Sequence, residues 1–345
     1  MVNPIVLRRT DSIGAADAEN DHQFLSQCFV DSGQLDLLLN IDEPHCVILG
    51  RTGSGKTALL LEIKKRVENS IQLAPEALSL SFLINSNVLN FFEEAGVHLD
   101  AFYKLLWQHV FCVELIKERY QIHNEERQRD FWTRCRDYFA RDKNKAKAKE
   151  DALRYLEYWG RNFWEETTTR VKEFTNKLES ELSADAHVDL KTIKLGAKGA
   201  LKLSEQERAE VVTHGQRIVN NVQIKDLHNL INLLQEDIFD DRRQPFYILI
   251  DRLDENWVDD RIRFKLIRAL IDAIRSFRQV RNVKVLVALR TDLLFSVLYR
   301  DMQPGFQTEK YETLYSRIPW NRDLLVRLLD ARTSAMFRRR YTGQT

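Results

Sequence analysis

The chain contains little glycine, proline or cysteine. Its 345 residues include 12 glycines and 6 prolines, which favours long uninterrupted helices over an all-β architecture and excludes a collagen-like chain. The four cysteines, Cys28, Cys46, Cys112 and Cys135, are scattered and form no CxxC pair. This spacing argues against a disulfide scaffold, a zinc ribbon or a thioredoxin-like site, and it fits unpaired thiols in a reducing compartment.

Long apolar runs are missing, and neither sign of charge dominates. No apolar run approaches the roughly 20 residues that span a bilayer, and residues 1–16 lack the apolar segment of a signal peptide. We therefore expect a cytoplasmic protein that does not bind a membrane. The formal net charge is +1. From residue 251 to 345, however, 19 basic residues face 12 acidic ones, so nucleic acid, an acidic protein or a neighbouring subunit stays open as a partner.

Against this scarcity, three of the 12 glycines lie within six residues. They belong to a segment that matches GxxxxGK followed by Ser or Thr, the Walker A pattern of a phosphate-binding loop. The segment consists of Gly50, Arg51, Thr52, Gly53, Ser54, Gly55, Lys56 and Thr57. A predicted strand over 45–49 precedes it and a predicted helix over 57–67 follows it, which is the context that this motif requires.

Each part of the segment has a chemical reason. Glycines let successive backbone N–H groups curl around phosphates, and the helix adds the positive end of its dipole. Lys56 places a positive charge between the β- and γ-phosphates, and the hydroxyl of Thr57 is suited to hold Mg²⁺. The segment therefore predicts binding of a nucleoside triphosphate with magnesium.

A second block predicts the metal-binding and catalytic carboxylates. Five apolar residues at 246–250 end in Asp251, the pattern of a Walker B strand, and a carboxylate at the carboxyl end of a parallel strand faces the nucleotide crevice. We expect Asp251 to hold Mg²⁺ through a water. Asp254 is our first choice for the residue that activates the attacking water, and Glu255 is the second.

A third block supplies a candidate cation. A predicted strand over 283–289 ends in Arg290 and Thr291, the place of a γ-phosphate sensor in P-loop ATPases, where Arg290 would stabilise charge in the transition state. Arg317 and Arg332 are weaker candidates for an arginine that acts on a neighbouring subunit or senses the nucleotide from a lid.

The element pattern predicts an α/β fold in which a mainly parallel sheet is covered by helices. Residues 1–87 and 241–345 would form the two parts of a P-loop NTPase core, and 88–240 a mainly helical insertion. Further strands are expected at 78–83 and 311–318, a β-hairpin at 187–203, and helices at 204–239, 259–280, 292–299 and 321–340. Basic and aromatic residues are interleaved over 120–164, a pattern that can bind single-stranded nucleic acid. The aromatic residues, however, recur at three- and four-residue spacings, which favours the buried face of a helix.

Four segments together resemble a known group. GRTGSGKTALL (50–60), FYILIDRLDENW (246–257), VKVLVALRTDLL (283–294) and IPWNRDLLVRLLDAR (318–332) resemble the bacterial P-loop ATPases of the KAP and STAND-like, AAA+-related group. The resemblance implies ATP-driven conformational switching, oligomerisation and a protein effector partner, often in anti-phage defence. Arg252 departs from the group, since relatives often carry a second acid there.

Two functions follow as hypotheses. In the first, the protein is an Mg²⁺-dependent ATPase that serves as a conformational switch or assembly platform in a bacterial defence system. In the alternative, motivated by Arg252, ATP joins subunits of a scaffold for an effector and is not hydrolysed. A GTPase is disfavoured, because the nearest match to a guanine-reading NKxD, Asn176-Lys177, lies in a charged helical stretch.

Overall fold

The computed structural model describes residues 11–15, 18, 20–75, 87–120, 176, 179–184, 188–221, 231–232, 234–239, 241, 243–255, 260–299 and 309–339. Several predicted segments lie outside these residues, among them the strand at 78–83 and nearly all of the aromatic segment 120–164. The described cysteines Cys28, Cys46 and Cys112 are buried and form no disulfide. No helix in these ranges is long and apolar enough to cross a bilayer.

A five-stranded parallel sheet forms the centre of the fold. The strands are β1 (Val47–Gly50), β2 (Asn69–Leu73), β3 (Phe246–Ile250), β4 (Val283–Arg290) and β5 (Tyr315–Arg317). They lie in the order β2-β3-β4-β1-β5, and all neighbouring pairs are parallel. The predicted parallel sheet is therefore confirmed, and the strands predicted at 246–250 and 283–289 are found almost to the residue.

The order of strands brings distant parts of the sequence to one edge. Gly50 pairs with Arg290, and Ile250 pairs with Val287. Because parallel strands all end at the same edge, the loops after β1, β3 and β4 begin close together. The three inner strands, β1, β3 and β4, are almost entirely apolar and buried, as expected for a sheet that is covered on both faces.

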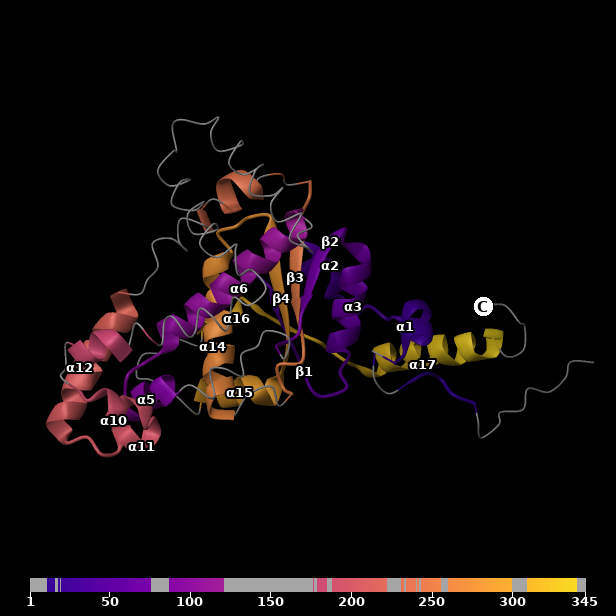
Figure 1. Cartoon of the computed structure of the whole chain (residues 1–345). Coiled ribbons are helices and arrows are strands. Elements are labelled where there is room, and N and C mark those ends of the chain that lie inside the picture. Colours follow the sequence, from indigo (N-terminus) through magenta and orange to yellow (C-terminus); the bar gives the residue numbers. More distant parts are fainter. Residues whose placement is uncertain are drawn as a thin grey trace, which may run out of the picture.

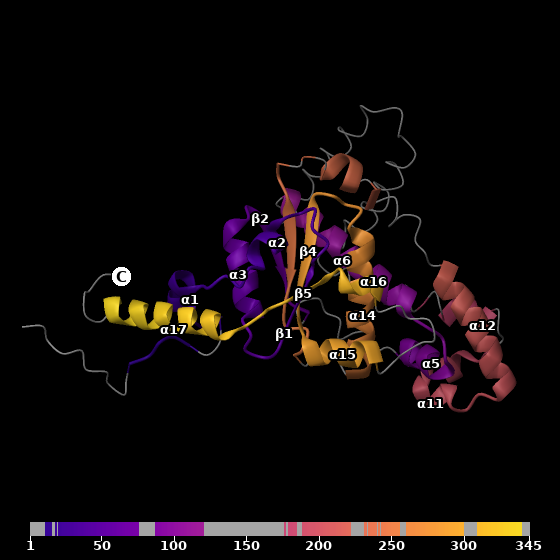
Figure 2. The same ribbon diagram turned by 180° about the vertical axis from the view of Figure 1, so that it is seen from behind.

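Helices cover the two faces of the sheet. Figures 1 and 2 show α2 (Leu35–Leu39) and α3 (Lys56–Arg66) on one side and α6 (Asp100–Tyr120) and α14 (Asp260–Phe277) on the other. Aromatic side chains join α6 to α14. The Trp107 indole N–H donates to the Leu266 carbonyl at 2.9 Å, and the rings of Phe111 and Phe277 meet edge to face at 5.4 Å.

Two helices extend away from the sheet. α1 (His22–Cys28) lies beside α17 (Arg322–Phe337), and both project from the side of α3 (Figures 1 and 2). The side chain of Asn321 caps α17 by accepting the Leu324 N–H at 2.9 Å. The shorter elements are α15 (Thr291–Tyr299), α16 (Glu309–Glu312) and the π-helix η3 (Leu234–Ile238).

The β-hairpin predicted over 187–203 is wrong, because this segment is helical. α10 (Leu190–Lys194) and α11 (Ala197–Ala200) pack against α5 (Asn87–Ala95). The evenly spaced leucines misled the prediction, since Leu195 and Leu201 are exposed and do not form one buried face. Gly199, within α11, permits the close approach of α11 to α10, because a Cβ on it would lie 1.9 Å from the Thr192 carbonyl oxygen.

Other boundaries also differ from those predicted. The edge strand β2 at Asn69–Leu73 was not expected from the sequence, while the strand expected at 311–318 is shorter and follows α16. Of the helix predicted at 204–239, the described part comprises α12 (Glu205–Asn221) and η3. The division of the chain at residues 88 and 240 stays a prediction.

Candidate functional site

The segment from Gly50 to Thr57 forms a turn between β1 and α3. Gly53 and Gly55 have φ angles of +74° and +86°, in the left-handed region that favours glycine. A Cβ on Gly50 would lie 2.1 Å from the Ser54 hydroxyl. All three glycines are thus required by the shape of this turn, which we call the glycine loop (residues 50–57).

The glycine loop presents backbone donors. The Ser54 N–H donates to the Arg51 carbonyl at 3.1 Å. The N–H groups of Gly53 and Gly55 meet no acceptor among the residues that the structure describes, and a Cβ on either would meet no atom within 4 Å. Together with the start of the eleven-residue helix α3, these donors can bind a multiply charged anion.

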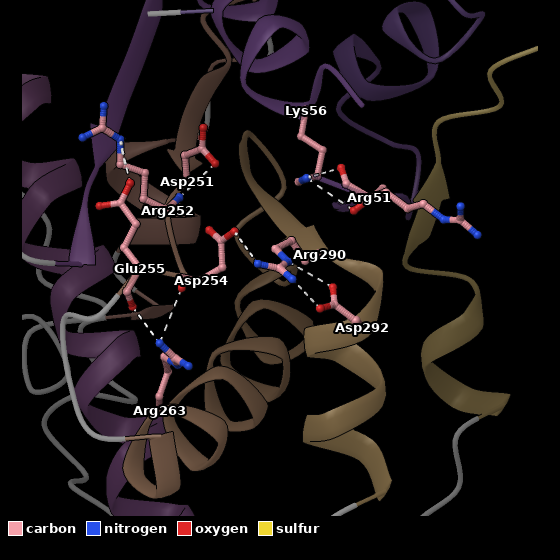
Figure 3. A network of polar contacts seen from close by, with 10 residues as sticks. Arg51, Lys56, Asp251, Arg252, Asp254, Glu255, Arg263, Arg290 and Asp292 are labelled. Atoms are coloured by element: carbon pink, nitrogen blue, oxygen red, sulfur yellow. Dashed lines mark hydrogen bonds and ion pairs between the residues drawn. The ribbon is translucent and has the colours of Figure 1, made fainter. Parts of the chain in front are cut away.

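Lys56 folds back along the glycine loop. Its ammonium group donates to the carbonyls of Gly50 at 3.3 Å and Arg51 at 3.0 Å, as Figure 3 shows. Burial lowers the pKa of Lys56, and the negative charges of Asp254 and Asp251 partly oppose that shift. A cation held by neutral carbonyls in a half-buried place is ready to exchange them for anionic oxygens.

Asp251 begins the loop after β3 and lies beside α3. Its carboxylate accepts a hydrogen bond from the Thr57 hydroxyl and another, at 2.9 Å, from the Arg252 N–H. Burial raises the pKa of Asp251, while the hydrogen bond from Thr57 and the charge of Lys56 lower it. The structure thus brings together the hydroxyl and the carboxylate that the sequence predicted as metal ligands.

These two groups fit Mg²⁺ in chemistry. Hydroxyl and carboxylate oxygens are ligands that Mg²⁺ prefers, and it commonly takes only one or two from the protein while water and phosphate supply the rest. Within the described ranges, no group of three His, Cys, Asp or Glu side chains could hold a metal by itself. Magnesium binding at Thr57 and Asp251 would therefore depend on a phosphate ligand.

Arg252 gives the chain after Asp251 an unusual turn. Its φ of +61° is the only left-handed one at a non-glycine residue in the described part of the chain. The Glu255 N–H closes the turn on the Arg252 carbonyl at 3.2 Å. Arg263, from α14, donates to the carbonyls of Glu255 at 2.9 Å and Asp254 at 3.5 Å, so the turn is fixed from behind.

The turn separates the two candidate bases. The Asp254 carboxylate points toward Arg290, whose guanidinium lies 3.7 Å away, whereas the Glu255 carboxylate points toward Arg252, also at 3.7 Å (Figure 3). The charge of Asp254 acts on the pKa of both Lys56 and Asp251. The geometry therefore places Asp254, and not Glu255, among the predicted site residues.

Arg290 ends β4 directly beside the start of the glycine loop. It donates to the Asp292 carboxylate at 3.0 Å, and this hydrogen bond raises the pKa of the guanidinium. Its charge in turn lowers the pKa of Lys56. Arg290 is thus placed near the site, as the sequence predicted. Arg317, by contrast, is exposed and pairs with Glu312 at 3.5 Å.

A cavity of about 390 Å³ adjoins the glycine loop. Its walls come from the loop itself, from the segment around α1 and from α17 with the residues before it. Apolar side chains dominate, among them Leu25, Phe29, Ile318 and Leu328. A mostly apolar hollow beside an anion-binding loop can hold the flat ring system of a ligand whose charged end lies on the loop.

Two residues of this cavity carry polar contacts that the sequence analysis did not predict. The Trp320 indole N–H donates to the Ser54 carbonyl at 2.8 Å. Arg332 binds the buried carboxylate of Asp21 and donates to the Ile13 carbonyl at 3.0 Å, so it ties α17 to the segment before α1. Both lie in the block 318–332, but nothing in the sequence marks the partners that they reach across the fold.

The comparisons with known proteins add nothing to this site. No family model, no curated protein and no solved structure matches the chain. The residues themselves are therefore the basis for a functional assignment. The structure brings together the glycine loop, Asp251, Asp254 and Arg290, and it turns Glu255 away from them.

Proposed function

We propose that the protein binds ATP together with Mg²⁺ on the glycine loop and hydrolyses it, as a member of the P-loop NTPase fold. The observation that carries this proposal is the convergence of Lys56, Thr57 and Asp251 at the carboxyl edge of a parallel sheet, next to a loop whose N–H groups are available to an anion.

The triphosphate would bind first through the backbone. The N–H groups of Gly53 and Gly55 would donate to phosphate oxygens, and Lys56 would exchange the carbonyls of Gly50 and Arg51 for the more strongly attracting phosphate. The apolar cavity beside the loop would take the base and the ribose. A loop for phosphates next to an apolar cavity favours a nucleotide over inorganic phosphate as the ligand.

Thr57 and Asp251 would hold the magnesium ion. When bound, Mg²⁺ would neutralise the negative charge that develops on the phosphate. The Thr57 hydroxyl, which donates to Asp251 in the free protein, would then turn a lone pair toward the ion. Burial raises the pKa of Asp251, whereas the hydrogen bond from Thr57 and the charge of Lys56 favour the ionised form that a metal ion needs.

Hydrolysis needs an oriented water and compensation of negative charge. Asp254 would accept a proton from the attacking water or orient it, since its carboxylate lies at the sheet edge beside Lys56 and Arg290. Arg290 and Lys56 would stabilise the charge that builds up on the transferred phosphoryl group.

The wider role of the protein rests on the resemblance described above. A conformational switch or assembly platform that oligomerises and acts on a protein effector in a bacterial defence system would use ATP in this way. Nucleic acid is a further partner compatible with the basic C-terminal part. Each of these is a proposal beyond the chemistry of the site.

The decisive experiment is ATP binding by the wild-type protein and by Lys56→Ala, measured by titration calorimetry with Mg²⁺. We expect the substitution to weaken ATP binding at least 100-fold, because a charge-assisted contact to phosphate is lost together with the neutralisation of the loop. Lys65→Ala is the matched control, since Lys65 lies on the same helix, is exposed and pairs only with Glu62 at 3.8 Å. Equal ATP affinity in wild type and Lys56→Ala would refute the assignment.

A further inference from the structure

Trp320 contacts the glycine loop from outside the motif. We propose that Trp320 is a positioning residue of the site: its indole N–H orients the peptide between Ser54 and Gly55 so that the Gly55 N–H faces the bound phosphates. This inference rests on the proposed nucleotide binding and assigns a role in it to a residue that no phosphate-loop pattern includes.

The position of Trp320 is fixed by the backbone on both sides. The Ile318 N–H donates to the Leu49 carbonyl at 3.1 Å, which continues the pairing of β5 with β1, and the Trp320 N–H donates to the Ile318 carbonyl at 3.2 Å. Asn321 then caps α17. The backbone that carries the indole is therefore hydrogen-bonded to β1, the strand that leads into the glycine loop. The indole thus has a defined position before any ligand binds.

The hydrogen bond to Ser54 determines a direction within the loop. In a trans peptide the C=O and the following N–H point in opposite directions. Because the Ser54 carbonyl accepts from the Trp320 indole at 2.8 Å, the Gly55 N–H points away from Trp320. The left-handed φ of Gly55, +86°, then passes the chain into α3.

The Gly55 N–H is a donor without an acceptor in the described part of the chain. A flexible glycine peptide that could rotate would lose this orientation, since glycine has the widest choice of backbone angles. The contact with Trp320 removes that freedom in advance, so that the loop does not have to be ordered by the ligand. A structural role for Trp320 as a wall of the cavity would not require the hydrogen bond.

The two roles make different predictions for a ligand that lacks a base. Tripolyphosphate offers the loop the same phosphate oxygens as ATP but places nothing in the apolar cavity. If Trp320 orients the loop, Trp320→Phe, which keeps a ring and removes the donor, weakens Mg²⁺–tripolyphosphate and Mg²⁺–ATP by a similar factor, about fivefold to tenfold. If Trp320 only contacts the base, tripolyphosphate binding is unchanged.

The experiment measures both affinities by calorimetry in wild type, Trp320→Phe, Trp320→His and the control Leu325→Ala, whose side chain is exposed on α17. Thermal unfolding of each variant checks that it is folded. Trp320→His keeps a ring N–H and should recover part of the tripolyphosphate affinity. Leu325→Ala should bind both ligands as the wild type does.

The outcomes separate the two proposals. Unchanged tripolyphosphate affinity in Trp320→Phe would overturn the positioning role, even where ATP affinity falls. A loss of tripolyphosphate affinity in Trp320→His as large as in Trp320→Phe would overturn it as well, because a ring N–H would then make no difference. Failure of the wild-type protein to bind either ligand would instead refute the nucleotide site itself, and the role of Trp320 with it.

Discussion

Asp254→Asn is the most informative substitution for testing the proposed hydrolysis. Asp254→Asn keeps the shape of the side chain and removes its negative charge and its ability to accept a proton. Glu255→Gln makes the same chemical change one residue further on, at a carboxylate that faces Arg252. These two variants compare neighbouring carboxylates that point in different directions, Asp254 toward Arg290 and Glu255 toward Arg252 (Figure 3).

The structure sets the size of the two possible effects. The ion pair between Asp254 and Arg290 is 3.7 Å long, and more than a third of each side chain is exposed, 38% for Asp254 and 35% for Arg290. Such pairs contribute at most about 1 kcal/mol to the free energy of unfolding, and Arg290 keeps Asp292 as a partner. Removing a residue that orients or deprotonates water lowers kcat by about 10²–10⁴-fold. Lost stability therefore cannot account for a loss of that size.

The assay is release of phosphate from ATP under single-turnover conditions, with ATP affinity measured in parallel. We expect Asp254→Asn to lower the rate at least 100-fold while ATP affinity changes less than about threefold, and Glu255→Gln to change the rate less than about threefold. A large loss in Glu255→Gln with normal turnover in Asp254→Asn would refute our assignment of the base. A wild-type protein that binds ATP but hydrolyses it no faster than Asp254→Asn would favour the non-hydrolysing scaffold.

Two further predictions concern stability. Lys284 is buried and donates to the Leu37 and Asn40 carbonyls, and burial lowers its pKa to about 8 from 10.5. Between these pH values the unfolded chain holds a proton that the folded protein has lost, so the free energy of unfolding rises with pH. From pH 7 to 10 the wild type should gain about 2–3 kcal/mol of this free energy relative to Lys284→Met. Denaturant titrations that give the same difference between the two proteins at both pH values would contradict this. Gly199→Ala should lower the free energy of unfolding by about 2 kcal/mol or more, because its Cβ would lie 1.9 Å from the Thr192 carbonyl oxygen. The control is Lys198→Ala at the exposed neighbouring residue, and equal stability of the two variants would refute the close contact.

The sequence predicted well those features that depend on local composition. The strand at 246–250 was found because it is an unbroken apolar run, and the strand at 283–289 because it is apolar apart from Lys284. The glycine loop was found because its spacing is fixed by φ angles that favour glycine. Strand β2 was missed because its polar residues, Asn69, Ser70 and Gln72, give it no such run at the edge of the sheet.

Features that depend on long-range contacts were beyond the sequence. The choice between Asp254 and Glu255 is made by the left-handed φ of Arg252 and by Arg263 on α14, and neither is visible in a linear pattern. Leu195 and Leu201 are an even number of residues apart, as on one face of a strand, but in the fold each is exposed at the end of a short helix. Trp320 and Ser54 are 266 residues apart, so their contact appears only once the sheet is formed.

The place of β1 between β4 and β5 in the sheet also has a consequence for how the protein folds. β1 pairs with β4 and β5, and Val47 lies beside Val287 and Tyr315, so both neighbours of β1 come from the last third of the chain. Contacts between residues so far apart in sequence form slowly, because a long loop must close before they stabilise anything. During synthesis β1 therefore has no native strand partner until most of the chain has been made. The proposed nucleotide site, which depends on β1, β3 and β4 together, should be among the last parts of the protein to form.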